Sequence, residues 1–180
     1  MNLIILALIA LISYLAFQNK KLLLQLALIP KIMHNNPKQW YRILSSGFVH
    51  ADFNHLLFNG ITLYFFGSFL EKAIGPVDYL ILFLGGILFG NLPSIMKQKN
   101  NENYISLGAS GGVSSLLFAF IYLYPTQLIY IFFIIPLPAF VFGILFVAYS
   151  FYANHKGRDG INHLAHLAGA AFGFLWVLFL

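Results

Sequence analysis

The chain has 180 residues, of which 60% are hydrophobic and 8% are charged, and its formal net charge is +5. So few charged side chains cannot cover a water-facing surface, and the composition is therefore typical of a membrane protein. The absence of cysteine excludes thiol nucleophiles, disulfides and thiolate metal sites.

Apolar stretches separated by glycine, proline or charge predict six membrane-spanning helices, because a hydrocarbon core of about 30 Å needs roughly 20 apolar residues per helix. The first stretch has neither a basic segment nor a small-residue cleavage site, so we interpret it as a retained helix and not a signal peptide. The expected fold is one all-α membrane domain over residues 1–180, without a separate soluble domain. Its helices are expected at residues 2–17, 53–73, 77–96, 109–124, 127–152 and 163–180.

The connection between the first two helices, residues 18–52, is too long for a turn and contains an apolar run of its own, LLLQLALIP. This pattern predicts a folded loop that is partly embedded in the membrane. Trp40 and Arg42 are expected to anchor the loop at the membrane interface. Further along, Pro136 and Pro138 are expected to kink or interrupt the fifth helix and to make it a moving element.

Polar side chains on the second, fourth and sixth helices are predicted to lie at one depth. These helices run in the same direction, because each crossing reverses the chain. Ser110 and His166 each lie fourteen residues before the expected end of their helix, which is about 21 Å at 1.5 Å per residue. His55 and Asn59 bracket this level on the second helix, so the set is expected roughly 6 to 12 Å below one membrane surface.

Small residues predict that the serine and the histidine meet. Ser110 lies in the sequence GASGG, between Gly108 and Gly111, and His166 shares a helix face with Gly169. Such residues let helices approach closely, as a hydroxyl and an imidazole must to come within about 2.6–3.2 Å.

The position of Ser110 at the first turn of a helix also favours stabilisation of a negative charge beside it. Free N–H groups and the positive end of the helix dipole favour a developing oxyanion there. The amide of Ser110 is therefore a candidate oxyanion donor, and His55 and Asn59, which share a helix face, are candidate side-chain donors. Together these residues predict a Ser–His dyad without an acid.

Other interpretations of the same residues stay open. Serine, glycine and asparagine in membrane helices often only pack, and a histidine can do so too. GASGG fits the G-x-S-x-G elbow, but no strand precedes it. A metalloenzyme would need a cluster such as His50, His55, His163 and His166, yet no H-E-x-x-H motif or inward carboxylate accompanies them. A transporter or non-catalytic binder of membrane segments predicts that Ser110→Ala leaves function intact.

Five motifs carry a resemblance to a known family: WYR in the first loop, HADFNHLLFN at the start of the second helix, FGSFLEKAIG at its end, GASG and AHLAG. They resemble the rhomboid intramembrane serine proteases in their compact bacterial six-helix form. The resemblance implies that Ser110 is the nucleophile, that His166 is its general base, and that His55 and Asn59 donate to the oxyanion. It also implies that His50, Trp40 and Arg42 organise the first loop.

The family implied by these motifs cleaves membrane-spanning helices of other proteins at or near the bilayer boundary, without a metal or cofactor. The expected partners are therefore transmembrane protein substrates and the lipid bilayer. Substrates would enter past the second and fifth helices, under a mobile cap at residues 153–161. Two positions depart from the family pattern: Ser114 replaces an aromatic residue one turn after the nucleophile, and Asn162-His163 replaces Asp-Asn before the histidine.

The charges bear on the partners and on the orientation. The positive side chains lie in short loops, where they meet lipid headgroups and not nucleic acid. Nine of the ten Lys and Arg residues lie on the same side as the site, so the positive-inside rule places the site toward the cytoplasm. The resemblance implies instead an inner bacterial membrane with the site open to the exterior, and we expect that orientation.

Overall fold

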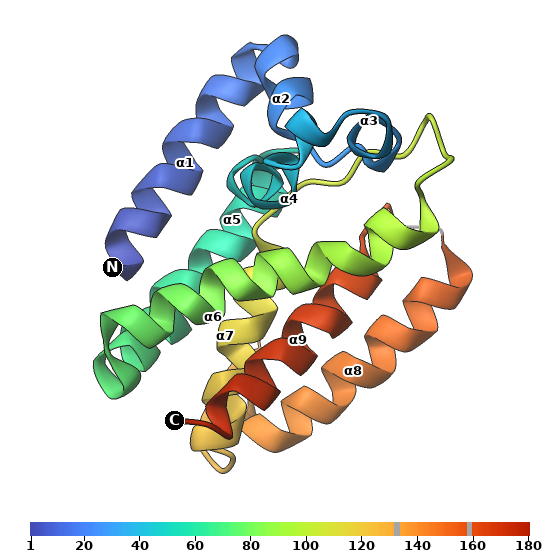
Figure 1. Ribbon diagram of the computed structural model, residues 1–180. Helices are drawn as coiled ribbons and strands as arrows, with labels where there is room; N and C mark the ends of the chain where they lie inside the picture. The colour runs from blue at the N-terminus through green and yellow to red at the C-terminus, as the bar shows by residue number, and fades with distance from the viewer. Residues whose placement is uncertain (132–133, 158–159) are drawn as a thin grey trace.

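The computed structural model describes residues 1–131, 134–157 and 160–180 as a bundle of helices (Figure 1). A short antiparallel hairpin joins two of the helices. In chain order the elements are α1 (Asn2–Gln18), α2 (Lys20–Leu26), α3 (Pro30–Asn35), α4 (Arg42–Ser45), α5 (Phe53–Thr62), α6 (Ser68–Lys97), α7 (Ser110–Leu123), β1 (Leu128–Ile131), β2 (Ile135–Pro138), α8 (Ala139–Lys156) and α9 (His163–Val177).

The second and third predicted helices form a hairpin of two long arms. α5 continues through a π-helical segment, η3 (Leu63–Gly67), into the first turns of α6. The chain then reverses at Gly75, whose φ of 83° lies in the left-handed region that glycine tolerates. Pro76 follows as the first residue of the returning arm, where a proline needs no N–H partner. The helices expected at 53–73 and 77–96 are thus confirmed as helices.

The length and composition of the helices differ along the chain. Within the described residues, Phe53–Lys97 is the stretch that is long and apolar enough to cross a membrane. α1, α7 and α9 are also apolar but have 10–17 residues each. α7 is nevertheless the central helix, because every residue from Gly111 to Ile121 is buried among its neighbours.

The expected helix at 127–152 is wrong in its first part. β1 and β2 pair there, with Leu128 opposite Pro138 and Ile131 opposite Ile135, and α8 begins only at Ala139. Prolines remove N–H donors and hold the preceding residue in an extended conformation, and the β-branched and aromatic residues around them favour strands. The proline segment therefore precedes the helix and does not kink it. Residues 132–133, within this expected helix, lie outside the described residues.

The first loop is folded, as expected, but Arg42 does not act as an interface anchor. Only 6% of its surface is exposed. Its Nη1 donates to the carbonyl oxygens of Leu24 and Ala27 at 2.6 and 2.7 Å, and its Nε donates to Gln39 at 2.8 Å. Trp40 is 48% exposed, so it is free to meet lipid. Arg42 instead satisfies backbone groups that would otherwise be buried without partners.

The first loop is tied to the body of the bundle next to the start of α7. The backbones of Leu28 and Ser106 form an isolated antiparallel bridge. Asn91 of α6 donates to the carbonyl oxygen of Ile43 at 2.8 Å and to the hydroxyl of Ser46 at 3.1 Å. The loop therefore contributes to the walls around the segment that precedes α7.

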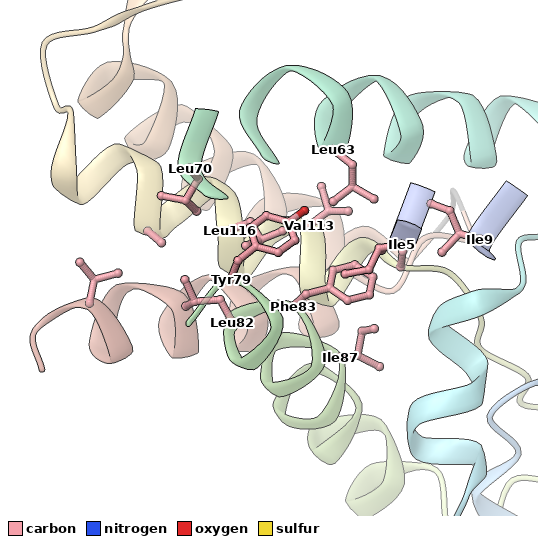
Figure 2. Close-up of a cluster of buried hydrophobic side chains, with 13 residues drawn as sticks. Ile5, Ile9, Leu63, Leu70, Tyr79, Leu82, Phe83, Ile87, Val113 and Leu116 are labelled. Atoms are coloured by element: carbon pink, nitrogen blue, oxygen red, sulfur yellow. The ribbon is translucent and has the colours of Figure 1, made fainter. Parts of the chain in front are cut away.

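The main core lies where α1, the α5–α6 hairpin and α7 meet. Figure 2 shows Tyr79 and Phe83 of α6 near Ile5 of α1 and Val113 and Leu116 of α7. These side chains are at most 8% exposed, so α7 is held on this side by apolar packing.

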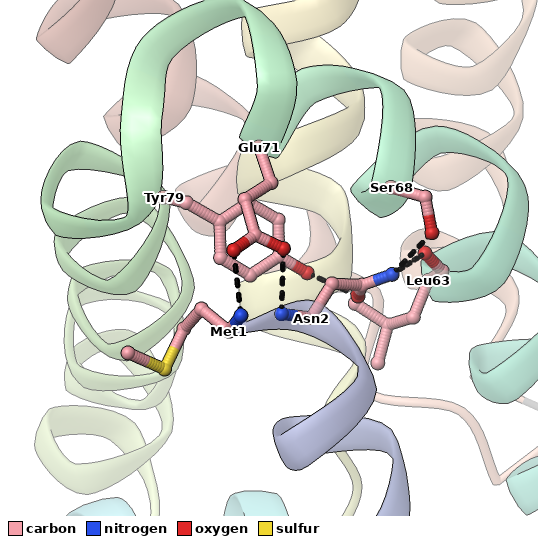
Figure 3. Close-up of polar contacts among 6 residues, drawn as sticks. All are labelled: Met1, Asn2, Leu63, Ser68, Glu71 and Tyr79. Carbon is pink, nitrogen blue, oxygen red and sulfur yellow. Dashed lines mark hydrogen bonds and ion pairs between the residues drawn. The ribbon is translucent and has the colours of Figure 1, made fainter.

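A polar network fixes the start of α1 against the hairpin (Figure 3). The amide nitrogen of the Asn2 side chain donates to the Leu63 carbonyl at 2.9 Å and to Ser68 at 2.8 Å. The Tyr79 hydroxyl donates to Asn2 at 2.6 Å, and the backbone N–H of Asn2 donates to Glu71 at 2.8 Å. This network holds one end of α1, and Ser13 in the second half of the helix contacts His50 of the first loop.

Candidate active site

One cavity collects the polar side chains that the sequence predicts to meet. Its volume is about 1140 Å³, and residues of α5, α6, α7, α8, α9 and the segment before α7 line it. The four predicted side chains of the dyad and the oxyanion donors lie in its wall, together with two of the predicted glycines. They are His55, Asn59, Gly108, Ser110, Gly111 and His166.

Ser110 is the first residue of α7, so its amide N–H belongs to the turn that has no acceptor within the helix. Gly108, two residues earlier, has a φ of 119°, which a residue with a side chain rarely adopts. A Cβ at Gly108 would also lie 2.7 Å from Nε2 of His55. The glycine therefore allows the turn and lets the His55 ring lie against the backbone next to Ser110.

Asn59 lies one turn after His55 on α5 and is 6% exposed. Its side-chain nitrogen donates one hydrogen to the His55 carbonyl at 2.9 Å. An amide group carries two N–H donors, so this bond leaves the second donor available to a group in the cavity.

His50 connects α1 to the backbone immediately before Ser110. Its side chain is fully buried. Nε2 accepts from the Ala109 N–H at 3.2 Å, and Nδ1 lies 2.8 Å from the Ser13 hydroxyl of α1. Since Nε2 accepts, the proton of the neutral ring lies on Nδ1 and is donated to Ser13. Burial and then the neighbouring His55 lower the pKa of His50 to about 3, against an opposing effect of Asp52, so the ring stays neutral.

The lowered pKa of His50 predicts that acid destabilises the fold. In the unfolded chain His50 gains its proton near pH 6.5, whereas the folded ring resists protonation until about pH 3. The free energy of unfolding should therefore fall between these values, by at most about 1.4 kcal/mol per pH unit. His50→Gln, which keeps an acceptor for Ala109 but does not titrate, should flatten the dependence of the melting temperature on pH.

The control for this experiment is His155→Gln, because His155 is exposed at the end of α8. It should leave the pH dependence of the melting temperature unchanged. Equal slopes for the wild type and His50→Gln between pH 6.5 and 4 would show that His50 is not kept neutral by burial.

The start of α9 is fixed by Asn162. Its side-chain oxygen accepts from the N–H of Ala165 at 3.2 Å, as a helix N-cap. Its nitrogen donates to the hydroxyls of Ser94 and Ser106 at 2.8 and 3.0 Å. An aspartate, expected here from the family pattern, could accept but not donate. Asn162 thus joins the helix that carries His166 to the end of α6 and to the segment before α7.

Glycines bring the backbones of α6, α7 and α9 into contact directly beside Ser110. A Cβ at Gly169 of α9 would overlap the carbonyl oxygen of Gly111 and lie 2.8 Å from its carbonyl carbon. A Cβ at Gly86 of α6 would lie 2.7 Å from the same oxygen. Gly86 of α6 and Gly169 of α9 therefore let both helices approach the α7 backbone at Gly111, the residue after Ser110. Gly169 lies one turn after His166.

Residues 37–180 match the family model described as the Rhomboid domain. The chain belongs to the rhomboid family. This family is helical and integral to membranes, so the chain is a helical membrane protein, in agreement with its composition.

Curated rhomboid relatives come from a plant, a bacterium and a yeast. The chain is 32% identical over 146 residues to RHOMBOID-like protein 12, mitochondrial, of Arabidopsis thaliana, covering 73% of this chain and 44% of the relative. It is 30% identical over 142 residues to Putative rhomboid protease YdcA of Bacillus subtilis, covering 76% and 65%. It is 32% identical over 139 residues to Rhomboid protein 1, mitochondrial, of Saccharomyces cerevisiae, covering 74% and 40%. The chain thus spans 40 to 65% of the length of these relatives.

Four of the six histidines of this rhomboid form two pairs. The rings of His50 and His55 are 4.9 Å apart between centroids, and those of His163 and His166 are 5.7 Å apart. Among the residues that the structure describes, no group of three His, Cys, Asp or Glu side chains could hold a metal ion. The metalloenzyme interpretation needs one cluster of four histidines, so this arrangement does not support it.

Two residues of the site were missed at the level of sequence. Asn162 departs from the family pattern, and an Asn before a helix is a recognisable N-cap signal that could have identified its role. Phe146 of α8 lines the cavity, and its ring centroid lies 5.9 Å from that of His166. No pattern distinguishes it from the other phenylalanines of a membrane helix.

Proposed function

We propose that this rhomboid is an intramembrane serine protease that hydrolyses a peptide bond in or near the transmembrane helices of other membrane proteins. Ser110 and His166 form the dyad. The observation that carries the proposal is the shared cavity, which is lined by both dyad residues and by both side-chain oxyanion donors. The Bacillus subtilis relative is named a putative rhomboid protease, in agreement with this assignment.

The proposed reaction proceeds in two steps. His166 takes the proton from the Ser110 hydroxyl, and Oγ attacks the substrate carbonyl carbon to form a tetrahedral intermediate. The Ser110 amide, the His55 imidazole and the Asn59 amide donate hydrogen bonds to its oxyanion. The intermediate collapses as His166 returns the proton to the leaving amine, and water then hydrolyses the acyl-enzyme with His166 as base.

Water can reach the proposed site from one side of the cavity. Exposed polar side chains of Lys97, Asn101 and Asn103, at the end of α6 and in the segment after it, line the same cavity as Ser110. Non-helical backbone within the depth of a membrane, such as that of the segment before α7, is tolerated where it lines a water-filled space. These exposed polar side chains therefore support a path by which water reaches the acyl-enzyme for deacylation.

We assign six membrane spans within a single domain: α1, the two arms of the α5–α6 hairpin, α7, α8 and α9. α7 has 14 residues, or about 21 Å, which is less than a hydrocarbon core of about 30 Å. Because its neighbours bury it, α7 does not have to match the lipid thickness. The short helix places Ser110 below the surface on one side.

We also assign the protein to the inner membrane of a bacterium, with the site toward the exterior. The positive-inside rule opposes this orientation, but part of the charge is engaged within the first loop. Arg42 is buried on backbone carbonyls, and Nζ of Lys31 lies 3.8 Å from Glu102. Such charges are weaker orientation signals than free loop lysines.

Covalent labelling tests the nucleophile directly. A fluorophosphonate probe should label the purified protein, and Ser110→Ala should abolish labelling because the probe reacts with an activated serine hydroxyl. Labelled residues are identified by mass spectrometry of the digested protein. A membrane-impermeant form of the probe should label Ser110 in intact cells if the site faces the exterior.

Ser115→Ala is the matched control for labelling, since Ser115 lies on the same helix and is fully buried. This variant should be labelled like the wild type. A wild-type protein that no serine-directed probe labels would contradict the protease and favour a non-catalytic binder of membrane segments.

A further inference from the structure

The support of the His166 ring comes from an unexpected helix. Ser114, one turn after Ser110 on α7, is 4% exposed and lines the cavity. Its side chain is too small to place a ring beside the imidazole from α7. Apart from His163 of the same helix, whose ring centroid lies 5.7 Å away, any aromatic surface against His166 must therefore come from an element other than α7.

Phe146 of α8 provides such a surface. Its ring centroid lies 5.9 Å from that of His166, and the two planes are inclined by 31°. The two rings are thus tilted relative to each other, at a centroid distance within the range of favourable ring pairs. Phe146 is half-buried and lines the same cavity as the dyad.

The Phe146 ring is itself held in place. It contacts Phe118 of α7 at 5.6 Å and Phe142 of α8 at 6.2 Å between centroids. One turn earlier on α8, a Cβ at Gly143 would lie 3.2 Å from Ile121 of α7. The buried glycine thus lets α8 approach α7 closely enough for Phe146 to reach the space beside His166.

We propose that Phe146 is the positioning residue for the base, which places the His166 imidazole for proton transfer from Ser110. This inference rests on the proposed function of the dyad. The Phe146 ring limits the rotation of the imidazole from the α8 side. On the α7 side, the small side chain of Ser114 leaves space. The orientation of the base then depends on a helix other than the two that carry the dyad.

The test compares variants at position 146 in cleavage of a fluorescent transmembrane substrate and in the rate of fluorophosphonate labelling. Phe146→Ala and Phe146→Leu should lower kcat by about 10- to 100-fold, because a small misplacement of a catalytic group has effects of that order. KM should stay within about threefold of wild type, and the labelling rate should fall in parallel with kcat. Phe146→Tyr, which keeps the ring, should remain within about threefold of wild type in kcat.

An aromatic ring introduced on α7 should compensate for the loss of the Phe146 ring. Adding Ser114→Phe to Phe146→Ala places an aromatic side chain one turn after Ser110, in space that the smaller residue 146 leaves free. The double variant should recover about tenfold in kcat over Phe146→Ala. Phe151→Ala removes a 54% exposed ring from the same helix and should match the wild type.

Outcomes that would overturn the inference are distinct from those that would overturn the protease. A kcat within twofold of wild type for Phe146→Leu, or a loss for Phe146→Tyr as large as for Phe146→Ala, would remove the positioning role. Phe146→Leu keeps the apolar volume, so it decides the question even if Phe146→Ala does not fold. Cleavage or labelling that persists in Ser110→Ala would instead remove the proposed function itself.

Discussion

Ser110→Ala and His166→Ala should each abolish cleavage of a model transmembrane substrate while the helix bundle stays folded. The first removes the attacking oxygen and the second removes the base, and loss of either member of such a unit lowers kcat by at least about 10³-fold. Because the two residues act together, the double variant should be no less active than either single variant. Cleavage is measured with purified protein in liposomes, and folding by the melting temperature.

The chain offers a matched control for each substitution. The Ser115 hydroxyl is buried and has no hydrogen-bond partner among the described residues, so Ser115→Ala removes a hydroxyl from α7 without breaking a bond. His155 is exposed and contacts the Phe151 carbonyl at 2.8 Å, so His155→Ala removes an imidazole away from the cavity. Both controls should cleave like the wild type. Cleavage retained in both dyad variants would defeat the Ser–His mechanism.

The shared cavity of the candidate site residues could be predicted from the sequence because it depends on few properties of the chain. Alternate helices run in the same direction, so Ser110 and His166 can be compared in depth from residue counts alone. Glycines at 111 and 169 then indicate which helix faces approach closely. The structure places the four predicted side chains in one cavity, and their catalytic roles stay predictions.

The wrong assignment at 127–138 has a local cause. LIYIFFIIP is apolar at nearly every position, so periodicity cannot separate a buried helix from a strand. Strand-forming β-branched and aromatic residues and two prolines were the better guide, because they favour extended backbone. Pro138 indeed has φ −55° and ψ 140°, and α8 begins one residue later.

Residues that act between elements could not be predicted in the same way. Arg42 has the sequence context of an interface anchor, but its role follows from the backbone carbonyls that the folded loop turns toward it. Phe146 is one of 20 phenylalanines. Its contact with His166 depends on the rotation of α8 about its axis, which a helix of nearly uniform hydrophobicity does not specify.

Gly169→Ala should have the second large effect, on stability and activity together. The added Cβ would overlap the Gly111 carbonyl oxygen, which is backbone and cannot move aside as a flexible side chain can. A Cβ at Gly86 of α6 would also lie 2.7 Å from this oxygen, so α6 and α9 both pack tightly against the same backbone group of α7. Overpacking of this kind costs about 1–3 kcal/mol, and because the overlap is with backbone we expect a loss in the free energy of unfolding at the upper end of this range.

The same substitution should lower cleavage because Gly169 lies one turn after His166. If α9 moves by about 1 Å to relieve the overlap, the imidazole moves away from Ser110, and a displacement of this size can lower the rate about 100-fold. Gly173→Ala, whose Cβ would overlap the Ser115 carbonyl oxygen of α7, should destabilise the bundle but affect cleavage less, since it is two turns from His166. Melting temperature and kcat are measured for both variants.

Gly60→Ala is the control for both variants, because it changes a helical glycine of α5 that has space around it. The nearest atom to its added Cβ is Cδ2 of Leu6 at 3.9 Å, an ordinary contact. Alanine also favours a helix over glycine by up to about 1 kcal/mol, so this variant should be at least as stable as the wild type and equally active. Gly169→Ala with wild-type stability and kcat would mean that α7 and α9 need not touch, and the close backbone approach would then no longer explain how a serine and a histidine on separate helices meet.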